Sequence, residues 1–294
     1  MSVGNLDRLA DLIRGGDVAV LSGAGLSTES GIPDYRGPSG LARRATPMTY
    51  QSFVGDPAAR QRYWARSYIG WRTFSGAAPN AGHHAVTTLE RSGLLSGIVT
   101  QNVDGLHQAS GATGVIDLHG SLDRVICLDC GNTVGRAEFD RRLREANPAF
   151  DARVTAINPD GDVDLDDADV ADFRVIACSV CPGGMLKPDV VFFGESVPRD
   201  RVASCFDVVE RSSALVVLGS SLTVMSGRRF VLRACKLGIP VAIVNQGVTR
   251  SDEVASVVVD AALGQALPAL VELLASALSG PEHRWPADSR PIAR

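Results

Sequence analysis

The stretch VAVLSGAGLSTESGIPDYRG, residues 18–37, begins with apolar residues and then runs into two glycines, Gly23 and Gly25. The apolar run 18–21 predicts a buried strand. Glycines directly after such a strand let the backbone approach a ligand that a Cβ atom would exclude. The first part of the stretch therefore predicts a phosphate-binding turn, whereas the second part, Pro33 to Arg36, needs its own explanation.

Strand-length apolar runs recur along the chain, and helical patterns lie between several of them. The runs are 97–100, 214–218, 240–244 and 257–259, and the helical patterns are 84–91, 202–211, 226–237 and 265–278. Continuous apolar strands that alternate with helices are typical of a parallel sheet covered on both faces. We therefore predict an α/β fold with a Rossmann-like, doubly wound parallel sheet. Asn5 is predicted to cap a further helix near the N-terminus.

Small and amide residues follow the predicted strands, where ligands of such sheets bind. They are Gly23 and Gly25, Gln101 and Asn102, Gly219 to Ser221, and Asn245. This pattern favours a dinucleotide site. Thr28 replaces the third glycine of the usual fingerprint, and no acidic residue stands at the ribose-reading position, which argues against a hydride-transfer dehydrogenase.

The composition limits the classes of partner. The chain has 294 residues, is 45% hydrophobic and carries a formal net charge of −4. Such a chain can bury a full α/β core, and it has no strong basic field, so we expect no direct nucleic-acid partner. Its N-terminus has no apolar run of signal-peptide length and no later stretch approaches a membrane span. We expect a soluble, cytoplasmic protein without a membrane partner, and a monomer is one open possibility for its oligomeric state.

Two Cys-x-x-Cys pairs predict a metal site. Cys127 and Cys130 form the first pair, and Cys178 and Cys181 form the second. Four thiolates can hold one Zn²⁺ and leave no open position, so the zinc is predicted to be structural. Redox pairs or disulfides are the alternatives, and the distance between the pairs exceeds that of a usual zinc ribbon. Cys205 and Cys235 lie in helical patterns and are predicted to be buried packing residues.

An acidic run and five histidines remain. The run PDGDVDLDDADVADF, residues 159–173, has Leu165 and Ala171 where a calcium loop needs glycine and glutamate, so it predicts a solvated insertion. Among the histidines, His83 and His84 are predicted to lie on the surface or to cap a helix, and His107 to be packed. His119 follows an apolar run and precedes Gly120, and its position alone leaves catalytic and packing roles equally open.

Six blocks of the sequence together resemble the sirtuins, which are NAD-dependent protein-lysine deacylases. They are GAGLSTESGIPDYRG, TQNVDGLH, DLHGSLDRVICLDC, GGMLKPDVVFFGE, LGSSLTV and IVNQG. The similarity covers roughly residues 5–278. The stretches RYWARSYIGW, NPDGDV and GVTRSD resemble the class II branch, near its animal mitochondrial members.

The resemblance implies one catalytic domain, 1–280, and a disordered tail, 281–294. Its Rossmann-like part spans about 1–37, 82–122 and 186–280, its helical and cofactor-loop segment about 38–81, and its zinc module about 123–185. NAD and an acylated lysine of a partner protein would meet between these parts. Residues 33–36 would belong to a mobile loop that closes over the nicotinamide ribose, with Tyr35 excluding water from the reacting carbon.

The resemblance also assigns roles to individual residues. His119 would be the base that takes a proton from a ribose hydroxyl, and Asn102 and Asp104 would also act in catalysis. Residues 191–195, which are Val191, Phe192, Phe193, Gly194 and Glu195, would pair their backbone with the substrate peptide. NAD would contact Gly23, Ala24, Gly25, Ser27, Thr28, Pro33, Asp34, Tyr35, Arg36, Gln101, Asn102, Val103, Asp104, Gly219, Ser220, Ser221, Asn245, Gln246, Gly247 and Leu263.

The acyl pocket departs from one pattern of the family. Members that prefer negatively charged acyl groups carry a Tyr-x-x-Arg pair, and the corresponding positions here hold Ser67 and Gly70. A pocket for neutral acyl groups is therefore expected. Two other functions stay open: a mono-ADP-ribosyltransferase, and a non-catalytic NAD sensor that docks partners through its zinc module. The intact His119, Asn102 and Asp104 argue against the sensor.

Overall fold

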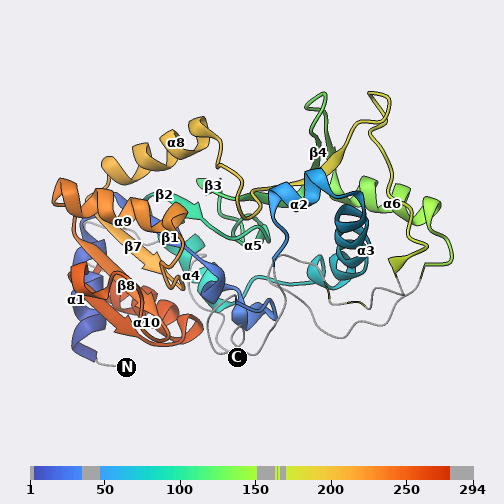
Figure 1. Ribbon diagram of the computed structural model, residues 1–294. Coiled ribbons are helices and arrows are strands. Elements are labelled where there is room, and N and C mark those ends of the chain that lie inside the picture. Colours follow the sequence, from blue (N-terminus) through green and yellow to red (C-terminus); the bar gives the residue numbers. More distant parts are fainter. Residues whose placement is uncertain (1–2, 35–46, 151–162, 164, 166–169, 279–294) are drawn as a thin grey trace.

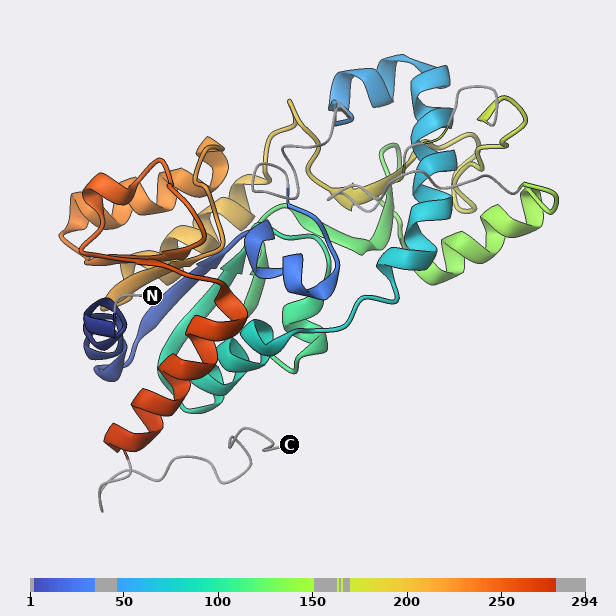
Figure 2. The same cartoon turned by 90° about the horizontal axis from the view of Figure 1, so that it is seen from below.

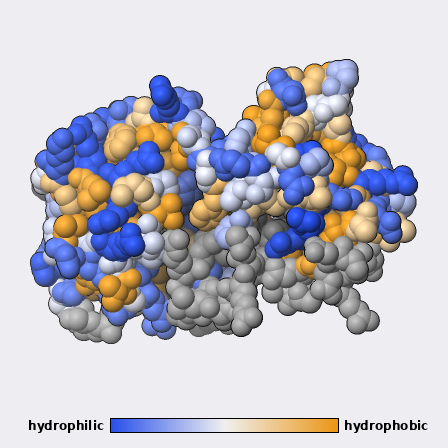
Figure 3. Space-filling model, in the orientation of Figure 1, coloured by the Kyte–Doolittle hydropathy of each residue, from blue (hydrophilic) through white to orange (hydrophobic). Residues whose placement is uncertain are grey.

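The computed structural model describes residues 3–34, 47–150, 163, 165 and 170–278. Figure 1 shows two lobes side by side, a large one around a parallel sheet and a small one around α2, α3, α6 and β4. The space-filling view narrows between the lobes into a notch (Figure 3). No helix among the described residues is long and apolar enough to cross a membrane.

The large lobe is built on a six-stranded sheet in the order β3-β2-β1-β7-β8-β9. Every neighbouring pair in it is parallel. The chain adds β2 and β3 on one side of β1 and then returns to add β7, β8 and β9 on the other, so the strand order reverses between β1 and β7. The strands are β1 (Val18–Ser22), β2 (Leu95–Thr100), β3 (Val115–Asp117), β7 (Ala214–Leu218), β8 (Val241–Asn245) and β9 (Val257–Asp260).

Helices cover both faces of this sheet because its strands are apolar on both sides. Along β1, Val18 and Val20 pack with one set of helices, and Ala19 and Leu21 pack with the other. Figure 2 shows α4 and α10 together on one side of the sheet. The first set is α1 (Val3–Arg14), α4 (Ala81–Arg91) and α10 (Leu263–Leu278), and the second is α8 (Arg199–Glu210) and α9 (Met225–Leu237). The predicted Rossmann-like, doubly wound fold is confirmed.

The small lobe combines helices α2, α3 and α6 with an antiparallel sheet in the order β5-β4-β6. Aromatic side chains of α3 lie in its core, where the Trp64 ring packs at a tilt with its centre 4.5 Å from that of Phe139 and donates from its indole nitrogen to the Leu186 carbonyl. Its elements are α2 (Tyr50–Gly55), α3 (Pro57–Phe74), β4 (Gly120–Cys127), β5 (Thr133–Gly135), α6 (Arg136–Ala146) and β6 (Leu186–Val190). The remaining short elements of the chain are η1 (Ala24–Leu26), η2 (Thr28–Ser30), α5 (Leu106–Ala109) and η3 (Asp252–Val254).

Several local predictions need correction. The first helix begins at Val3, and Asn5 does not cap it but donates from its side chain to the Val258 carbonyl. Strand β6 pairs with β4 in the small sheet, although its residues were assigned to the Rossmann-like part. In the acidic run, Val163, Val170 and Phe173 are buried in the small-lobe core, so those residues are not solvated. Most of its carboxylates lie outside the described residues.

The predictions for single side chains had different outcomes. His83 is buried rather than on the surface, and the alternative that it caps a helix is confirmed, because its Nδ1 accepts from the Asn80 backbone at the start of α4. Cys235 is exposed, whereas Cys205 is buried as predicted. His107 is buried and contacts the Ser22 hydroxyl through Nε2 at 2.9 Å, which confirms its packing role.

Candidate active site and zinc site

The turns after β1 and β7 touch where the strand order reverses. An added Cβ at Gly23 or at Gly25 would lie 2.8 Å from the Gly219 carbonyl oxygen, and Gly219 itself has φ +62°. The Gly25 amide donates to the Gly219 carbonyl at 2.8 Å. Close backbone approach between two strand ends therefore requires these glycines, which was not foreseen. The same point of a doubly wound sheet is where dinucleotides bind.

The end of β2 contributes two amide side chains to this point. Gln101 donates to the Ser220 hydroxyl at 2.9 Å, which links the ends of β2 and β7. Asn102 donates to the Gly23 carbonyl at 3.1 Å and to the Ser27 hydroxyl at 3.0 Å. The structure thus brings together Gln101, Asn102 and the glycine turn, as predicted from strand ends alone.

Asp104 shares this network and is half-buried. Its carboxylate accepts from the Ser27 hydroxyl at 2.7 Å and from the Leu106 amide at 2.9 Å. Burial raises the pKa of Asp104, and these two hydrogen bonds partly oppose that shift. The side chain is therefore held in one orientation beside Asn102. Its carboxyl group can form a hydrogen bond with a polar ligand there.

His119 follows β3 and has a defined tautomer. Its Nδ1 lies 2.9 Å from the Gln101 carbonyl oxygen, and its Nε2 lies 2.9 Å from the Ser226 hydroxyl. A carbonyl oxygen only accepts, so Nδ1 carries the hydrogen, and in the neutral ring Nε2 is the basic nitrogen that accepts from Ser226. The tight turn behind it is Gly120, at φ +85°, where a Cβ would collide with the Asp189 carbonyl.

Electrostatics keep this imidazole neutral. Burial lowers the pKa of His119, and the nearby guanidinium groups of Arg201 and Arg229 lower it further, while the hydrogen bond to Gln101 raises it. A neutral imidazole whose Nε2 carries no hydrogen can act as a general base near pH 7. Sequence reasoning missed Ser226, whose only signal is its position in the first turn of α9, facing the end of β3.

The residues predicted at the adenosine end lie along the ends of β7 and β8. Asn245 donates to the Gly247 carbonyl at 2.8 Å, and Gln246 and Gly247 are exposed. The Ser221 hydroxyl contacts Thr223 at 3.1 Å. The Leu263 side chain is buried in the core at the start of α10, so only its backbone could reach a ligand.

The segment between the glycine turn and the predicted cofactor loop is anchored by α4 and α10. The Asn80 side chain donates to the Leu26 carbonyl and the Ser30 hydroxyl, and the Glu29 carboxylate accepts from the Gly264 amide at 2.9 Å. Pro33 is buried and Asp34 is half-buried. Tyr35 and Arg36 lie outside the described residues.

The remaining members of the predicted cofactor set line the same turn. Ser27 is buried, and Ala24 and Thr28 are half-buried beside it. The Thr28 hydroxyl donates to the Gly25 carbonyl at 3.0 Å, which holds the turn closed. Val103 packs on the small-lobe core, so it stands between the two lobes.

The predicted peptide-binding stretch forms a turn after β6 rather than a longer strand. The Val191 amide donates to the His119 carbonyl at 2.8 Å, and the Phe193 carbonyl accepts from the Tyr50 amide at 2.9 Å. The Phe192 amide donates to the Glu195 carboxylate at 2.8 Å. These bonds place the turn against the backbone of His119 and occupy the Val191 and Phe192 amides, so pairing with a peptide must use other backbone groups of the stretch.

The four cysteines of the two pairs converge at one end of β4. Their sulfur atoms all lie within 4.8 Å of one another. The Cys127 and Cys181 sulfurs are 3.6 Å apart and those of Cys130 and Cys178 are 3.8 Å apart. Four thiolates at about 2.3 Å from one zinc ion would be separated by about 3.8 Å, so the arrangement fits tetrahedral Zn²⁺ rather than disulfides.

These features define a class: a doubly wound α/β protein with a dinucleotide-type crevice, a poised histidine and a cysteine module that fits structural zinc. The chain belongs to the Sir2 family, whose model matches residues 23–226. It is 59% identical to NAD-dependent protein deacetylase 1 of Streptomyces coelicolor, over 92% of this chain and 90% of that one. It is 50% identical to NAD-dependent protein deacetylase 1 of Mycobacterium avium, over 93% and 98%.

Solved structures agree with this assignment. A structure that describes the mechanism and regulation of Sir2 enzymes has a TM-score of 0.75 and 29% identity, and the match covers 93% of this chain and 99% of that one. A Sir2 structure with a p53 peptide and NAD⁺ has a TM-score of 0.72 and 27% identity, with 91% and 98% covered. The fold and the NAD-dependent family predicted from the sequence are therefore confirmed.

Proposed function

We propose that this protein is an NAD-dependent protein-lysine deacylase that produces nicotinamide, free lysine and O-acyl-ADP-ribose. The observation that carries the proposal is the tautomer of His119: its Nδ1 donates to the Gln101 carbonyl at the end of β2, which leaves Nε2, beside the Ser226 hydroxyl, without a proton. Relatives at 46–59% identity are named deacetylases, which supports the same chemistry. NAD supplies an activated bond between nicotinamide and ribose.

The chain's own residues would then act as follows. Gly23, Ala24 and Gly25 hold the pyrophosphate close to the backbone, and Gln101 and Asn102 orient the ribose hydroxyls. Asp104 binds the carboxamide of the leaving nicotinamide. The acyl oxygen of the substrate lysine would attack the ribose carbon as the bond to nicotinamide breaks. His119 would then accept a proton at Nε2 from a ribose hydroxyl that takes the place of Ser226, and the ribose oxygen would attack the acyl carbon. Hydrolysis would break the bond from that carbon to the lysine nitrogen, so that free lysine leaves and the acyl group stays on ADP-ribose. The remaining predicted contacts are Ser27, Thr28, Pro33, Asp34, Tyr35, Arg36, Val103, Gly219, Ser220, Ser221, Asn245, Gln246, Gly247 and Leu263.

The substrate is an acylated lysine on another protein, presented in extended form against residues 191–195. This turn contacts His119 through the Val191 amide, so a peptide paired there would bring its lysine toward the base. Backbone pairing reads little side-chain sequence, which fits a broad set of protein substrates. A Sir2 relative has been solved with a p53 peptide, which supports peptide binding as such.

The acyl pocket is proposed to favour neutral groups. Ser67 and Gly70 replace the Tyr-x-x-Arg pair, but a guanidinium does lie beside Ser67: Arg136 donates to the Ser67 hydroxyl at 3.0 Å and to its carbonyl at 2.9 Å. That arginine was not expected from the sequence. It is 1% exposed and packs among aromatic rings, so its known partners already hold it in the core.

Three finer assignments belong to the same proposal. The chain falls in the class II branch near the animal mitochondrial members, on the strength of RYWARSYIGW and GVTRSD. One catalytic domain spans 1–280, with its zinc module at about 123–185. The protein works in the cytoplasm, where NAD is available and thiols stay reduced.

Mass spectrometry of products from acyl-lysine peptides incubated with NAD tests the proposal. A panel of acetyl, longer neutral, succinyl and malonyl peptides should give free lysine together with an acyl group on ADP-ribose, and the neutral acyl peptides should react far faster. A buried carboxylate without a free cation is penalised by several kcal/mol. Absence of O-acyl-ADP-ribose with every peptide would reject the function, and equal kcat/KM for acetyl and succinyl peptides would reject the neutral pocket.

A further inference from the structure

One lysine is buried beside the turn formed by residues 191–195. Lys187 lies on β6 and is 3% exposed, whereas Lys236, the other lysine of the chain, is exposed at the end of α9. Lysine and arginine together number 29, so nearly every basic position holds arginine. Lysine side chains are rarely buried unless each of their donors has a partner. The contacts of Lys187 therefore call for a functional explanation.

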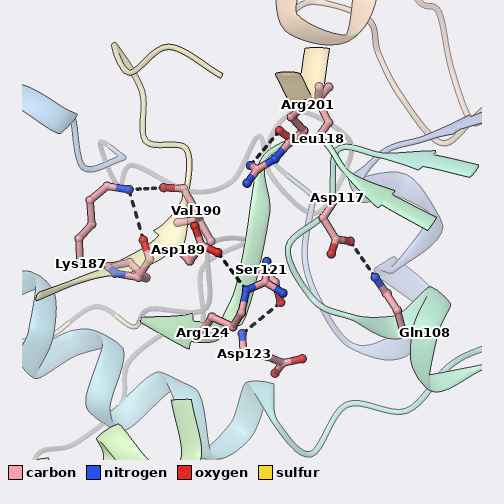
Figure 4. A network of polar contacts seen from close by, with 11 residues as sticks. Gln108, Asp117, Leu118, Ser121, Asp123, Arg124, Lys187, Asp189, Val190 and Arg201 are labelled. Carbon is pink, nitrogen blue, oxygen red and sulfur yellow. Dashed lines mark hydrogen bonds and ion pairs between the residues drawn. The ribbon is translucent and has the colours of Figure 1, made fainter. Parts of the chain in front are cut away.

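The ammonium group of Lys187 has three donors and meets three acceptors. It donates to the Pro188 carbonyl at 3.2 Å and to the Val190 carbonyl, and it pairs with the Glu195 carboxylate at 3.0 Å. Figure 4 shows the nitrogen turned toward the Val190 carbonyl at the end of β6. All three acceptors lie on the strand end and the turn that follows it, so one side chain ties both together.

The same group also contacts Phe192, one of the two aromatic residues of the turn. The Lys187 nitrogen lies 4.7 Å from the centre of the Phe192 ring, and that ring packs at 5.3 Å from Phe53. The Glu195 carboxylate, held by Lys187, accepts from the Phe192 amide at 2.8 Å. Without the cation, Glu195 would lose its charge partner, and the turn would lose the bond that sets the direction of its backbone.

The turn is connected to the proposed base on its other side. The Val191 amide donates to the His119 carbonyl at 2.8 Å, so a shift of the turn moves the backbone on which the imidazole stands. A compact ammonium can reach three oxygens converging from one segment, whereas the planar fork of arginine is longer and donates in fixed directions. This difference accounts for a lysine here in an arginine-rich chain.

We propose that Lys187 is a positioning residue that fixes residues 191–195 for backbone pairing with the acyl-lysine peptide and holds that turn against His119. The inference rests on the proposed deacylase function for its kinetic consequence. Its structural consequence is independent of that function: Lys187 keeps the turn ordered in the protein without any substrate. Lys187 touches neither NAD nor the acyl group in this role and acts through Val190, Phe192 and Glu195.

Hydrogen exchange of the full-length protein, followed by mass spectrometry, tests the structural part without any substrate. In Lys187→Met, the amides of Val191, Phe192 and Glu195 should exchange at least ~10-fold faster than in the wild type, while amides of β1 and β7 keep their rates. Lys236→Met is the matched control and should leave the turn unchanged. Unchanged exchange at residues 191–195 in Lys187→Met would overturn the proposal.

Steady-state kinetics test the functional part. Lys187→Met should raise KM for an acetyl-lysine peptide at least ~10-fold and leave KM for NAD within about 2-fold, a split that general destabilisation would not produce. Equal rises in both KM values, or none, would overturn the positioning role. If Lys187→Met does not fold, Lys187→Arg is used, with a smaller rise of about 3-fold expected in the peptide KM alone. Wild-type protein inactive on every acyl peptide would refute the proposed function, while the exchange experiment would still decide the role of Lys187.

Discussion

His119 is the proposed general base, because its Nδ1 hydrogen is fixed by the Gln101 carbonyl and its Nε2 is left basic. We predict that His119→Ala lowers turnover of an acetyl-lysine peptide at least ~100-fold, the low end for general-base catalysis, with NAD binding largely intact. His84→Ala, an exposed histidine of α4, is the control and should keep full turnover. Turnover of His119→Ala near the wild-type value would assign the proton transfer to another group.

The pH profile reports the same residue. Burial lowers the pKa of His119, so the folded imidazole stays neutral to a pH below the usual 6.5. The acid limb of kcat/KM for the peptide should therefore lie below pH 6.5. The Ser226 hydroxyl donates to Nε2 and so favours the neutral ring; Ser226→Ala should move the acid limb upward. An acid limb above pH 6.5 in the wild type would contradict the assigned environment.

His83 and His107 make stability depend on pH. Burial lowers the pKa of His83 to about 3 and that of His107 to about 4, from 6.5. Between pH 6.5 and 4 the unfolded chain binds protons that the folded chain does not, so the free energy of unfolding falls as the pH falls, by up to about 1.4 kcal/mol per pH unit for each histidine.

Urea unfolding at pH 7.5 and 5.0 measures this dependence. His107→Gln removes one titrating group and can keep a hydrogen bond to Ser22, so it should lose less stability between the two pH values than the wild type. His84→Gln should match the wild type, because this side chain is exposed. Identical pH dependence in His107→Gln and the wild type would show that His107 does not resist protonation.

At the scale of elements, we expect the folding of the zinc module to depend strongly on each of its four cysteines. Its two cysteine pairs come from the end of β4 and from the loop before β6, and the Gly184 carbonyl accepts from the Cys178 amide at 2.9 Å. We predict that Cys178→Ser releases the metal and lowers Tm by more than about 5 °C, since metal binding and module folding are coupled. Cys235→Ser, at an exposed cysteine of α9, should change neither metal content nor Tm. A metal-free protein with an unchanged Tm would reject structural zinc.

Elements with a strong local pattern could be predicted from the sequence, and those held by distant contacts could not. Strand β7 occupies the predicted run 214–218, because all its residues are apolar and buried. Helix α6 was not foreseen: Phe139 and Leu143 are its only large apolar residues and make a short stripe among charged side chains. The helix is held against α3 through Arg136 and Phe139. The pairing of β6 with β4 was likewise hidden, since nothing local marks which sheet a strand joins.

At the scale of the whole molecule, the site also has features that the local sequence predicts and features that depend on distant contacts. Strand-end positions were enough to predict Gln101, Asn102 and the glycine turn, because parallel strands end at one edge of a sheet. The tautomer of His119 and the role of Ser226 required the fold, since residues 101, 119 and 226 are far apart in sequence. The close contact of Gly23 and Gly25 with the Gly219 backbone could not be predicted for the same reason.

The contact between the turn at residues 191–195 and His119 bears on which transfer reaction dominates. Deacylation and mono-ADP-ribosylation both begin with loss of nicotinamide, so nicotinamide release alone cannot separate them. They differ in what attacks the ribose carbon: an amide oxygen of an acylated lysine, or an exposed nucleophilic side chain that needs no acyl group. A turn at residues 191–195 that is bonded to His119 fits an acyl-lysine peptide, because only deacylation needs both the peptide contact and the base. We therefore predict that NAD consumption requires an acylated peptide and that the acyl group is recovered on ADP-ribose.

Labelled NAD, incubated with matched acylated and unacylated protein, measures both outcomes. Accumulation of labelled ADP-ribose on unacylated protein, faster than deacylation of every peptide tested, would make the transferase the principal activity.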